Sequence, residues 1–374
     1  MLLDRFVDAD VPSPEPVGVR TPTPADVERL RSVVGTCLVT VTVATEPSPL
    51  GMDTAEAFRL AAALAEVERR LRLELPLDEA VRLADRCRRL AVDVIEEPTG
   101  HGLMVLVGAG VAEAHRLAVA PIERVVIDPT FATRDLERSV QEQPPALVAV
   151  VDGVGVVVAV VDDRGVHPTS DRPPTPPPAH PAAQHRWARE VAAAVERELA
   201  ERRLPLVVVG PRSLRELIGG HLDTVPVASL EARVAPTRVE LVPMVRTALA
   251  SAHRRALAAG LARVEDAANT GAVLRGMDAV WSAACSGGLD LVVVDAAYAP
   301  SARIDRGGGI VELVEDPSPP GVTDDLVDEL VELTVLTGGR VLFAEPGGLG
   351  PDGVAAVPRP ATGPAPLDRL VGVA

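Results

Sequence analysis

Residues 324–345 read DDLVDELVELTVLTGGRVLFAE. The apolar residues of the first half recur at three- and four-residue spacing, which predicts a helix over Asp324–Leu336. Gly338-Gly339 follow it, and glycine is a usual helix stop. Val341–Ala344 is then a short apolar run, which predicts a buried strand. A helix followed at once by a buried strand is typical of an α/β fold.

The neighbouring residues extend this pattern into a complete C-terminal domain. The expected elements are a helix over Val273–Cys285 and strands over Leu289–Val294 (LDLVVV), Gly309–Val314 and Gly353–Val357. Short loops join them. This order predicts a compact α/β/α sandwich over residues 267–374.

Residues 143–266 predict a middle α/β domain. Leu147–Val151 and Val154–Val161 flank Asp152-Gly153, a pair that suits a type I′ hairpin turn. Residues 167–181, HPTSDRPPTPPPAHP, contain seven prolines in fifteen positions, which excludes a helix or a central strand and predicts an extended loop. The elements expected after this Pro-rich loop are a helix over Gln184–Glu201, a strand over Leu206–Gly210 and a long helix over Arg238–Asp266.

Residues 1–142 predict an N-terminal domain of mixed α/β type. The expected elements are a strand over Cys37–Ala44, helices over Asp53–Leu75 and Leu77–Ile95, and a hairpin of Leu103–Val107 with Val111–Val119 around Gly108-Ala109-Gly110. The fold class is therefore three consecutive α/β domains.

Composition limits the function. Hydrophobic residues make up 47% of the 374 positions, which is enough for buried cores. All 37 basic residues are arginine, so a single arginine carries little functional weight, and 53 acidic residues bring the net charge to −16. A chain this acidic repels nucleic acid on average, so any RNA contact must come from a local patch.

The cellular location follows from three observations. Cys37, Cys87 and Cys285 lie far apart, which argues against disulfides and zinc and suits a reducing compartment. The N-terminus lacks the basic and then apolar run of a signal peptide. The longest apolar run, Ala146–Val161, is too short and too interrupted to span a bilayer. We expect a soluble, cytoplasmic protein with no membrane partner.

Common catalytic and cofactor motifs are missing from the sequence. Without lysine there is no phosphate-binding P-loop, and Glu113 stands where a dinucleotide fingerprint on Gly108-Ala109-Gly110 needs its third glycine. No GxSxG nucleophile elbow occurs. We therefore predict no catalytic residue and no cofactor.

Two weak candidates for a metal site have simpler explanations. His180 and His185 have no ligand partner at a suitable spacing. Asp152, Asp162 and Asp163 fall at strand ends, where a metal-dependent nuclease could place carboxylates, but turns account for them. We predict no metal site.

One patch combines cations with an aromatic ring. Residues 184–189, QHRWAR, open a helix directly after the Pro-rich loop, and such a set can stack on bases and hold phosphate. Trp187 lies about 100° around the helix from Arg186, so a place in the core is the alternative for the indole. The candidate RNA-binding residues are Gln184, His185, Arg186, Trp187, Arg189, Arg202 and Arg203.

The order of the three domains resembles that of the archaeal and eukaryotic class-one peptide chain release factors and Pelota. The similarity rests on the helix before LDLVVV, on DDLVDELVELTVLTGGRVLFAE and the closing GGLGPDGVAAV, and on LPLVVVGP and HLDTVPVASLEA in the middle domain. It covers nearly the whole chain. The chain is similar to the bacterial members of this superfamily, the Balon-like proteins of actinobacteria.

The resemblance implies a ribosome-associated factor that binds the A site in translational stress or hibernation. Its partners would be ribosomal RNA, tRNA and, through the C-terminal domain, a translational GTPase. Release factors carry Gly-Gly-Gln in the middle-domain loop, whereas here the Pro-rich loop stands in that place and no Gly-Gly-Gln occurs. Ala182-Ala183-Gln184 is only an echo, since alanine does not take positive φ angles freely.

The missing Gly-Gly-Gln motif leaves three hypotheses for the function. The first is a non-enzymatic factor whose Pro-rich loop points towards the peptidyl-transferase centre. The second is a peptidyl-tRNA hydrolase or rescue factor with an altered loop, in which Gln184 orients water. The third is a protein-interaction module that has lost RNA binding, consistent with the charge of −16.

Overall fold

The computed structural model describes residues 19–162, 165–169, 176–305, 309–315, 319 and 321–360. Its contacts divide the chain into two compact units. The first unit takes in the chain up to Thr21 and Ser32–Ala132; the second takes in Pro22–Arg31 and the chain from Thr133 onward. Asp163, Gly307, Gly308 and residues 170–175 of the Pro-rich loop lie outside the described residues.

The first unit is one antiparallel sheet with two helices on one face. The strands, in sheet order, are β3 (Val111–Leu117), β2 (Gly102–Gly108), β1 (Val34–Ala44) and β4 (Arg124–Thr130). Helices α2 (Thr54–Glu74) and α3 (Leu77–Val94) pack their apolar faces on β1 and β2 through Leu60, Val67, Cys87 and Leu90. Asp53 caps α2: its carboxylate accepts the amide N–H of Glu56, and Glu56 accepts that of Asp53.

Gly108, Ala109 and Gly110 form the predicted hairpin turn. Gly108 pairs with Val111, and Ala109 and Gly110 take φ angles of 43° and 83°. The turn needs a positive φ at both positions; Gly110 supplies it at little steric cost, whereas alanine rarely takes it. The hairpin interpretation is confirmed.

The middle part of the second unit is a five-stranded mixed sheet covered on both faces. Its strands, in sheet order, are β7 (Gly165–Pro168), β6 (Val156–Asp162), β5 (Ala146–Val151), β8 (Leu206–Gly210) and β9 (Ala228–Glu231). Alternate residues of β5 face opposite layers, with Leu147 and Ala149 against α5 (Pro181–Arg202) and Val148 and Val150 against α7 (Arg238–Asn269). Helix α6 (Arg212–Gly219) packs beside α5.

The connection between β5 and β6 differs from the expected type I′ turn. Val151 pairs with Val156, and the amide N–H of Asp152 donates to the carbonyl of Gly155 at 2.9 Å, so Gly153 and Val154 lie at the tip of the turn, one residue later than expected. One carboxylate oxygen of Asp152 accepts the amide N–H groups of Val154 and Gly155 at 2.8 and 3.1 Å. The predicted hairpin is confirmed, but its turn is not centred on Asp152-Gly153, because the aspartate side chain accepts the amide N–H groups that follow it.

The C-terminal part of the second unit is the predicted α/β/α sandwich. Strands β10 (Leu274–Arg275), β15 (Val354–Pro358), β11 (Leu289–Asp295) and β14 (Arg340–Ala344) lie in that order, with β11 and β14 parallel. Helices α8 (Met277–Cys285) and α9 (Leu326–Leu336) cover one face, and the end of α7 covers the other. The remaining elements are the hairpin β12 (Ser301–Ile304) and β13 (Ile310–Val314) and the short helix η1 (Gly350–Asp352).

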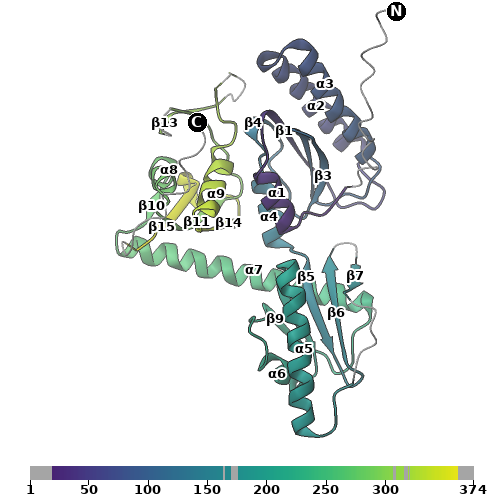
Figure 1. Ribbon diagram of the computed structural model, residues 1–374. Helices are drawn as coiled ribbons and strands as arrows, with labels where there is room; N and C mark the ends of the chain where they lie inside the picture. The colour runs from purple at the N-terminus through teal and green to yellow at the C-terminus, as the bar shows by residue number, and fades with distance from the viewer. Residues whose placement is uncertain are drawn as a thin grey trace, which may run out of the picture. The chain divides into compact units, whose positions relative to one another are not determined.

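Helix α7 runs from the middle sheet to the C-terminal sheet without interruption (Figure 1). Thr237 caps its start with a capping box on Glu240. Near its other end, Gly260 brings the helix against β14, since a Cβ there would lie 2.3 Å from Cδ1 of Leu342. One helix therefore serves as a cover for both sheets.

Two further helices, not yet described, also belong to the second unit. They are α1 (Pro24–Arg31), early in the sequence, and α4 (Arg134–Glu142), between β4 and β5. The domain boundaries expected after residues 142 and 266 stay predictions. In the described part of the chain, no helix is both long enough and apolar enough to cross a membrane.

Replacing Gly210 with alanine should destabilise the second unit. Gly210 ends β8 with a φ of 152°, and a Cβ would lie 2.2 Å from the carbonyl oxygen of Val151. We expect a loss of about 1 to 3 kcal/mol in the free energy of unfolding, measured by urea denaturation. Gly219→Ala is the matched control, since nothing lies within 4 Å of its Cβ position. Equal midpoints for the two variants would contradict the expectation.

Candidate functional site

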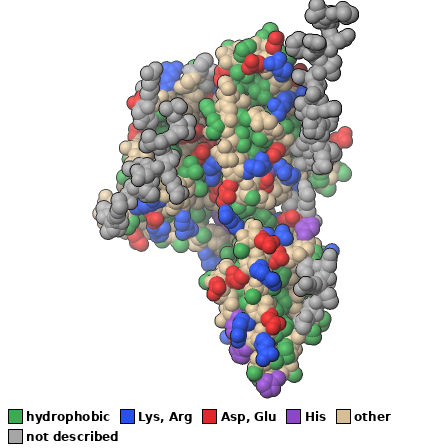
Figure 2. Space-filling view, viewed as in Figure 1, with side chains coloured by type: hydrophobic (Ala, Val, Ile, Leu, Met, Phe, Trp, Pro, Cys, Tyr) green, Lys and Arg blue, Asp and Glu red, His purple; other side chains and the backbone are tan. Residues whose placement is uncertain are grey.

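The start of α5 lies at one end of the middle sheet, directly after the Pro-rich loop (Figure 1). Nδ1 of His180 accepts the amide N–H of Ala182 at 3.3 Å and so caps the helix, and Pro181 occupies the first helical position. Histidine and arginine side chains gather at this end of the unit in Figure 2. The helix begins three residues earlier than the sequence predicts.

Four of the candidate RNA-binding residues come together here. His185, Arg186 and Arg189 are exposed, and Gln184 is half-buried. The amide N–H of Gln184 donates to the carbonyl of His180 at 3.0 Å, so this glutamine lies inside the first turns of the helix. We call the side chains of Gln184, His185, Arg186 and Arg189 the α5 entry patch.

The α6–β9 connection adds a residue that the sequence analysis missed. Nδ1 of His185 lies 3.3 Å from Nε2 of His221, and the two rings meet edge to face. His221 follows a short helix and shows no motif of its own, so only the tertiary contact identifies it. A neutral imidazole has one ring nitrogen that donates and one that accepts, so the two rings can form a hydrogen bond.

Trp187 lies in the core. Its side chain is 6% exposed and packs with Val151, Ala188 and Ile218 between α5, α6 and the sheet. A nucleic-acid base needs an open ring face for stacking. The structure therefore supports the core alternative for this indole.

Arg202 and Arg203 lie at the other end of α5. Sixteen residues separate Arg186 from Arg202, which is about 24 Å along a helix. Nε of Arg202 pairs with Glu198 at 3.0 Å, and Arg203 adopts a φ of 52° at the helix end and pairs with Glu28 at 3.7 Å. The two arginine pairs do not form one continuous surface.

Asp152 and Asp162, which the sequence analysis considered for a nuclease site, accept backbone N–H groups within turns. Asp162 accepts the amide N–H of Gly165 at 3.1 Å, and Nε2 of His167 lies 3.1 Å from the same oxygen. Asp163 lies outside the described residues. Across the ranges that the structure describes, no three His, Cys, Asp or Glu side chains are grouped so that they could hold a metal ion.

The cysteines are poor nucleophiles. Burial raises the pKa of the Cys37 thiol to about 11, with Glu74 adding to the effect, and burial raises that of Cys87 to about 12. The thiolate is the reactive form, and both thiols stay protonated at neutral pH. Cys285 is exposed, and burial of its sulfur still raises its pKa.

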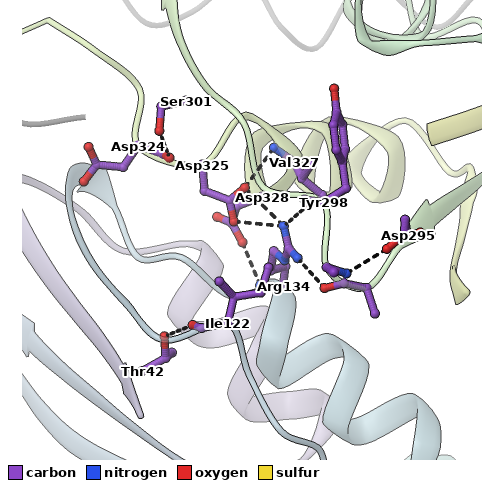
Figure 3. Close-up of polar contacts among 12 residues, drawn as sticks. Thr42, Ile122, Arg134, Asp295, Tyr298, Ser301, Asp324, Asp325, Val327 and Asp328 are labelled. Carbon is purple, nitrogen blue, oxygen red and sulfur yellow. Dashed lines mark hydrogen bonds and ion pairs between the residues drawn. The ribbon is translucent and has the colours of Figure 1, made fainter. Parts of the chain in front are cut away.

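A buried charge cluster on α4 and α9 is the second polar feature of this unit (Figure 3). Arg134 is 1% exposed. Its Nη1 donates to the carbonyl of Tyr298 at 2.8 Å and to the carboxylate of Asp325 at 3.2 Å. Its Nη2 donates to the carbonyl of Ala296 at 3.0 Å. Asp328 accepts the amide N–H groups of Thr133 and Arg134 at 2.7 and 2.6 Å. We call Arg134, Asp325 and Asp328 the α4–α9 cluster.

The cluster also explains how two helices begin. Thr133 makes no side-chain cap for α4, so the carboxylate of Asp328 from another helix takes that place. Asp325 caps its own helix by accepting the amide N–H of Val327 at 3.1 Å. The sequence shows an acidic helix start at DDLVDEL but nothing that pairs it with Arg134, which lies about 190 positions earlier.

The solved structures that this chain resembles include translation factors. Yeast (S. cerevisiae) Dom34, a translation termination-like factor, aligns with 91% of this chain and 94% of its own at 10% identity and a TM-score of 0.41. Archaeal Pelota, from a model of ribosome-bound Pelota and ABCE1, aligns with 91% of this chain and 95% of its own at 14% identity and a TM-score of 0.40.

The archaeal translation termination factor aRF1 aligns with 91% of this chain and 99% of its own, at 14% identity and a TM-score of 0.24. No family model and no curated protein sequence matches the chain.

Replacing Arg134 with alanine should destabilise the second unit strongly. The substitution leaves Asp325 buried without its cation, and an unpaired buried charge costs about 3 to 5 kcal/mol. Urea denaturation measures the change. Arg29→Ala is the control, since Arg29 is largely exposed and its pair with Asp26 should contribute at most about 1 kcal/mol. A cost for Arg134→Ala no larger than for Arg29→Ala would show that the cluster does not hold this part of the fold.

Proposed function

We propose that this chain is a non-enzymatic, ribosome-associated factor that occupies the A site in translational stress or hibernation. The observation that carries the proposal is the α5 entry patch. It follows the Pro-rich loop directly, and it places exposed Arg186 and Arg189 at the end of the middle sheet.

The electrostatics of this helix start favour a phosphate. Residues 181–189 contain no acid, and the first carboxylate of α5 is that of Glu190. The helix dipole and the free amide groups of a helix start attract negative charge, and α5 has no acid in its first turn. In a chain of net charge −16, this acid-free segment is a local exception of the kind that RNA binding requires.

The same segment argues against hydrolysis by the release-factor route. That route needs glycines that allow a glutamine to approach peptidyl-tRNA at a loop tip, whereas Gln184 lies within a helix and is bonded to His180. Prolines would stiffen the Pro-rich loop, residues 167–181, so that it could fill a space but not position a nucleophile. We therefore propose that this loop points towards the peptidyl-transferase centre as a plug.

For the other parts of the chain, the proposed roles follow from the resemblance to release factors and Pelota. We propose that the first unit faces the decoding centre and that the C-terminal sandwich faces a translational GTPase. A cytoplasmic location follows from a ribosomal partner.

Reversing the two arginine charges of the patch should weaken ribosome binding. We expect Arg186→Glu with Arg189→Glu to lower co-sedimentation with ribosomes from the protein's own source, prepared from stationary-phase cells, by about tenfold or more at low salt. The slope of log affinity against log salt should also fall by about one for each lost phosphate contact.

The control for this measurement is Arg197→Glu, an exposed arginine on the same helix outside the patch. Its affinity should change less than that of the double variant. If the unaltered protein does not co-sediment with ribosomes at all, the proposal fails and the protein-interaction module takes its place.

One observation favours a second candidate, a peptidyl-tRNA hydrolase or rescue factor. Gln184 is next to His185, whose contact with His221 provides an imidazole pair that can accept a proton. In this mechanism Gln184 would orient the water that attacks the ester.

The two candidates differ in a release assay with peptidyl-tRNA on ribosomes. We expect no release by the unaltered protein above background, and the same result for Gln184→Ala, because the glutamine is held in a helix. Release by the unaltered protein that Gln184→Ala abolishes would establish the hydrolase instead. Release that survives the substitution would remove this role from Gln184.

A further inference from the structure

Helices α2 and α3 of the first unit lie side by side, and a groove of about 320 Å³ lies between them (Figure 1). Its lining is mostly apolar and includes Ala61 and Ala65 of α2 and Val92 of α3. The charged side chains of the lining, Glu68 and Arg88, form an ion pair with each other and leave the groove without net charge. We call this space the α2–α3 groove.

Apolar side chains are exposed along this groove. Val92, in its lining, is 69% exposed, and Phe58 of α2 is 75% exposed. Phe58 precedes Ala61 by three residues, so the ring lies one helical turn from the groove lining. An aromatic side chain gains much free energy from burial, and apolar groups that gather on a surface mark a place where another segment binds.

The chain enters the described part of the first unit beside the α2–α3 groove. Val19 is 3% exposed and belongs to the same apolar cluster as Leu60 and Leu64, which also line the groove. The amide N–H of Arg20 donates to the carbonyl of Ala114 at 3.1 Å, which fixes the backbone on β3. The preceding residues, 1–18, are therefore tethered next to the groove by the chain itself.

The first seven residues, MLLDRFV, have the pattern of an amphipathic helix. Leu2 and Leu3 are followed four positions later by Phe6 and Val7, a spacing that gives a helix one apolar side. One acid and one base lie between the two apolar pairs, so this stretch carries no net side-chain charge. Both properties suit an apolar groove without net charge.

The residues between this stretch and Val19 are long enough to reach the groove. Residues 8–18, DADVPSPEPVG, contain three prolines. Eleven residues of extended, Pro-rich chain span about 34 Å at roughly 3.1 Å per residue. A helix with its side chains is about 10 to 12 Å across, so this length is enough to pass around one helix.

We propose that residues 1–7 dock in the α2–α3 groove, with Leu2 and Phe6 packed against the alanines of α2. The docked segment covers Phe58 and Val92. A tethered segment has an effective concentration in the millimolar range, which favours it over a free partner for the same groove. This inference does not depend on ribosome binding.

Thiol reactivity in the full chain tests the docking. Ala61→Cys places a thiol in the groove, and Ala62→Cys places one at the next position of the helix, which is exposed and outside the lining. Both chains also carry Cys285→Ser, because Cys285 is exposed. The thiol of Ala61→Cys should react with N-ethylmaleimide about tenfold faster when Leu2→Asp and Phe6→Asp are added. The thiol of Ala62→Cys should react at the same rate with and without them.

Two further variants are controls for added charge and for the choice of probe. Ala9→Asp with Ser13→Asp adds the same charge outside the apolar stretch and should leave the reaction of Ala61→Cys slow. Ala65→Cys, a second exposed position in the groove, should repeat the result of Ala61→Cys. Equal rates with and without Leu2→Asp and Phe6→Asp overturn the proposal. Protection that weakens on dilution of the protein overturns it too, because a second copy then fills the groove.

Discussion

Arg134 is a charged side chain in the interior of the second unit, and α4, the start of α9 and the segment after β11 meet around it. Its guanidinium reaches two backbone carbonyls and one carboxylate, which come from the segments before α9 and from the start of α9 itself. Removing an ion from water costs several kcal/mol, and only a nearly complete set of partners repays that cost. The position of α4 on the C-terminal sandwich is a consequence of this requirement.

The rest of the molecule is built from small apolar residues. Only 2% of the chain is aromatic, and the cores of both units consist mainly of valine, leucine and alanine. Such side chains allow close approach of elements, as where Gly260 lets α7 pack against Leu342. Since these contacts are not directional, the polar contacts between α4 and α9 give this pair of helices a defined placement that apolar packing does not supply.

The candidate site was only partly accessible to sequence reasoning. QHRWAR after a Pro-rich loop indicated a cationic segment near a helix start, because cations and a position next to a loop are local properties, and the structure places Arg186 and Arg189 on the surface. The contribution of His221, the burial of Trp187 and the separation of Arg202 from Arg186 depend on how α5 packs on α6 and the sheet. Arg134 gave no signal, since its partners lie about 190 residues away and arginine is the only strongly basic residue in the chain.

The spacing of apolar residues, together with helix caps and glycine stops, determined most helices and strands without further information. The helix, the glycines and the strand of residues 324–345 are examples. These are local properties, because hydrophobic spacing, caps and glycine stops act within a few residues. Tertiary structure alone decided which strands pair, which early helix joins the second unit, and which charges are buried together. Those outcomes depend on the free energy of contacts between distant segments, and a buried charge reveals its partners only when the chain has folded around it.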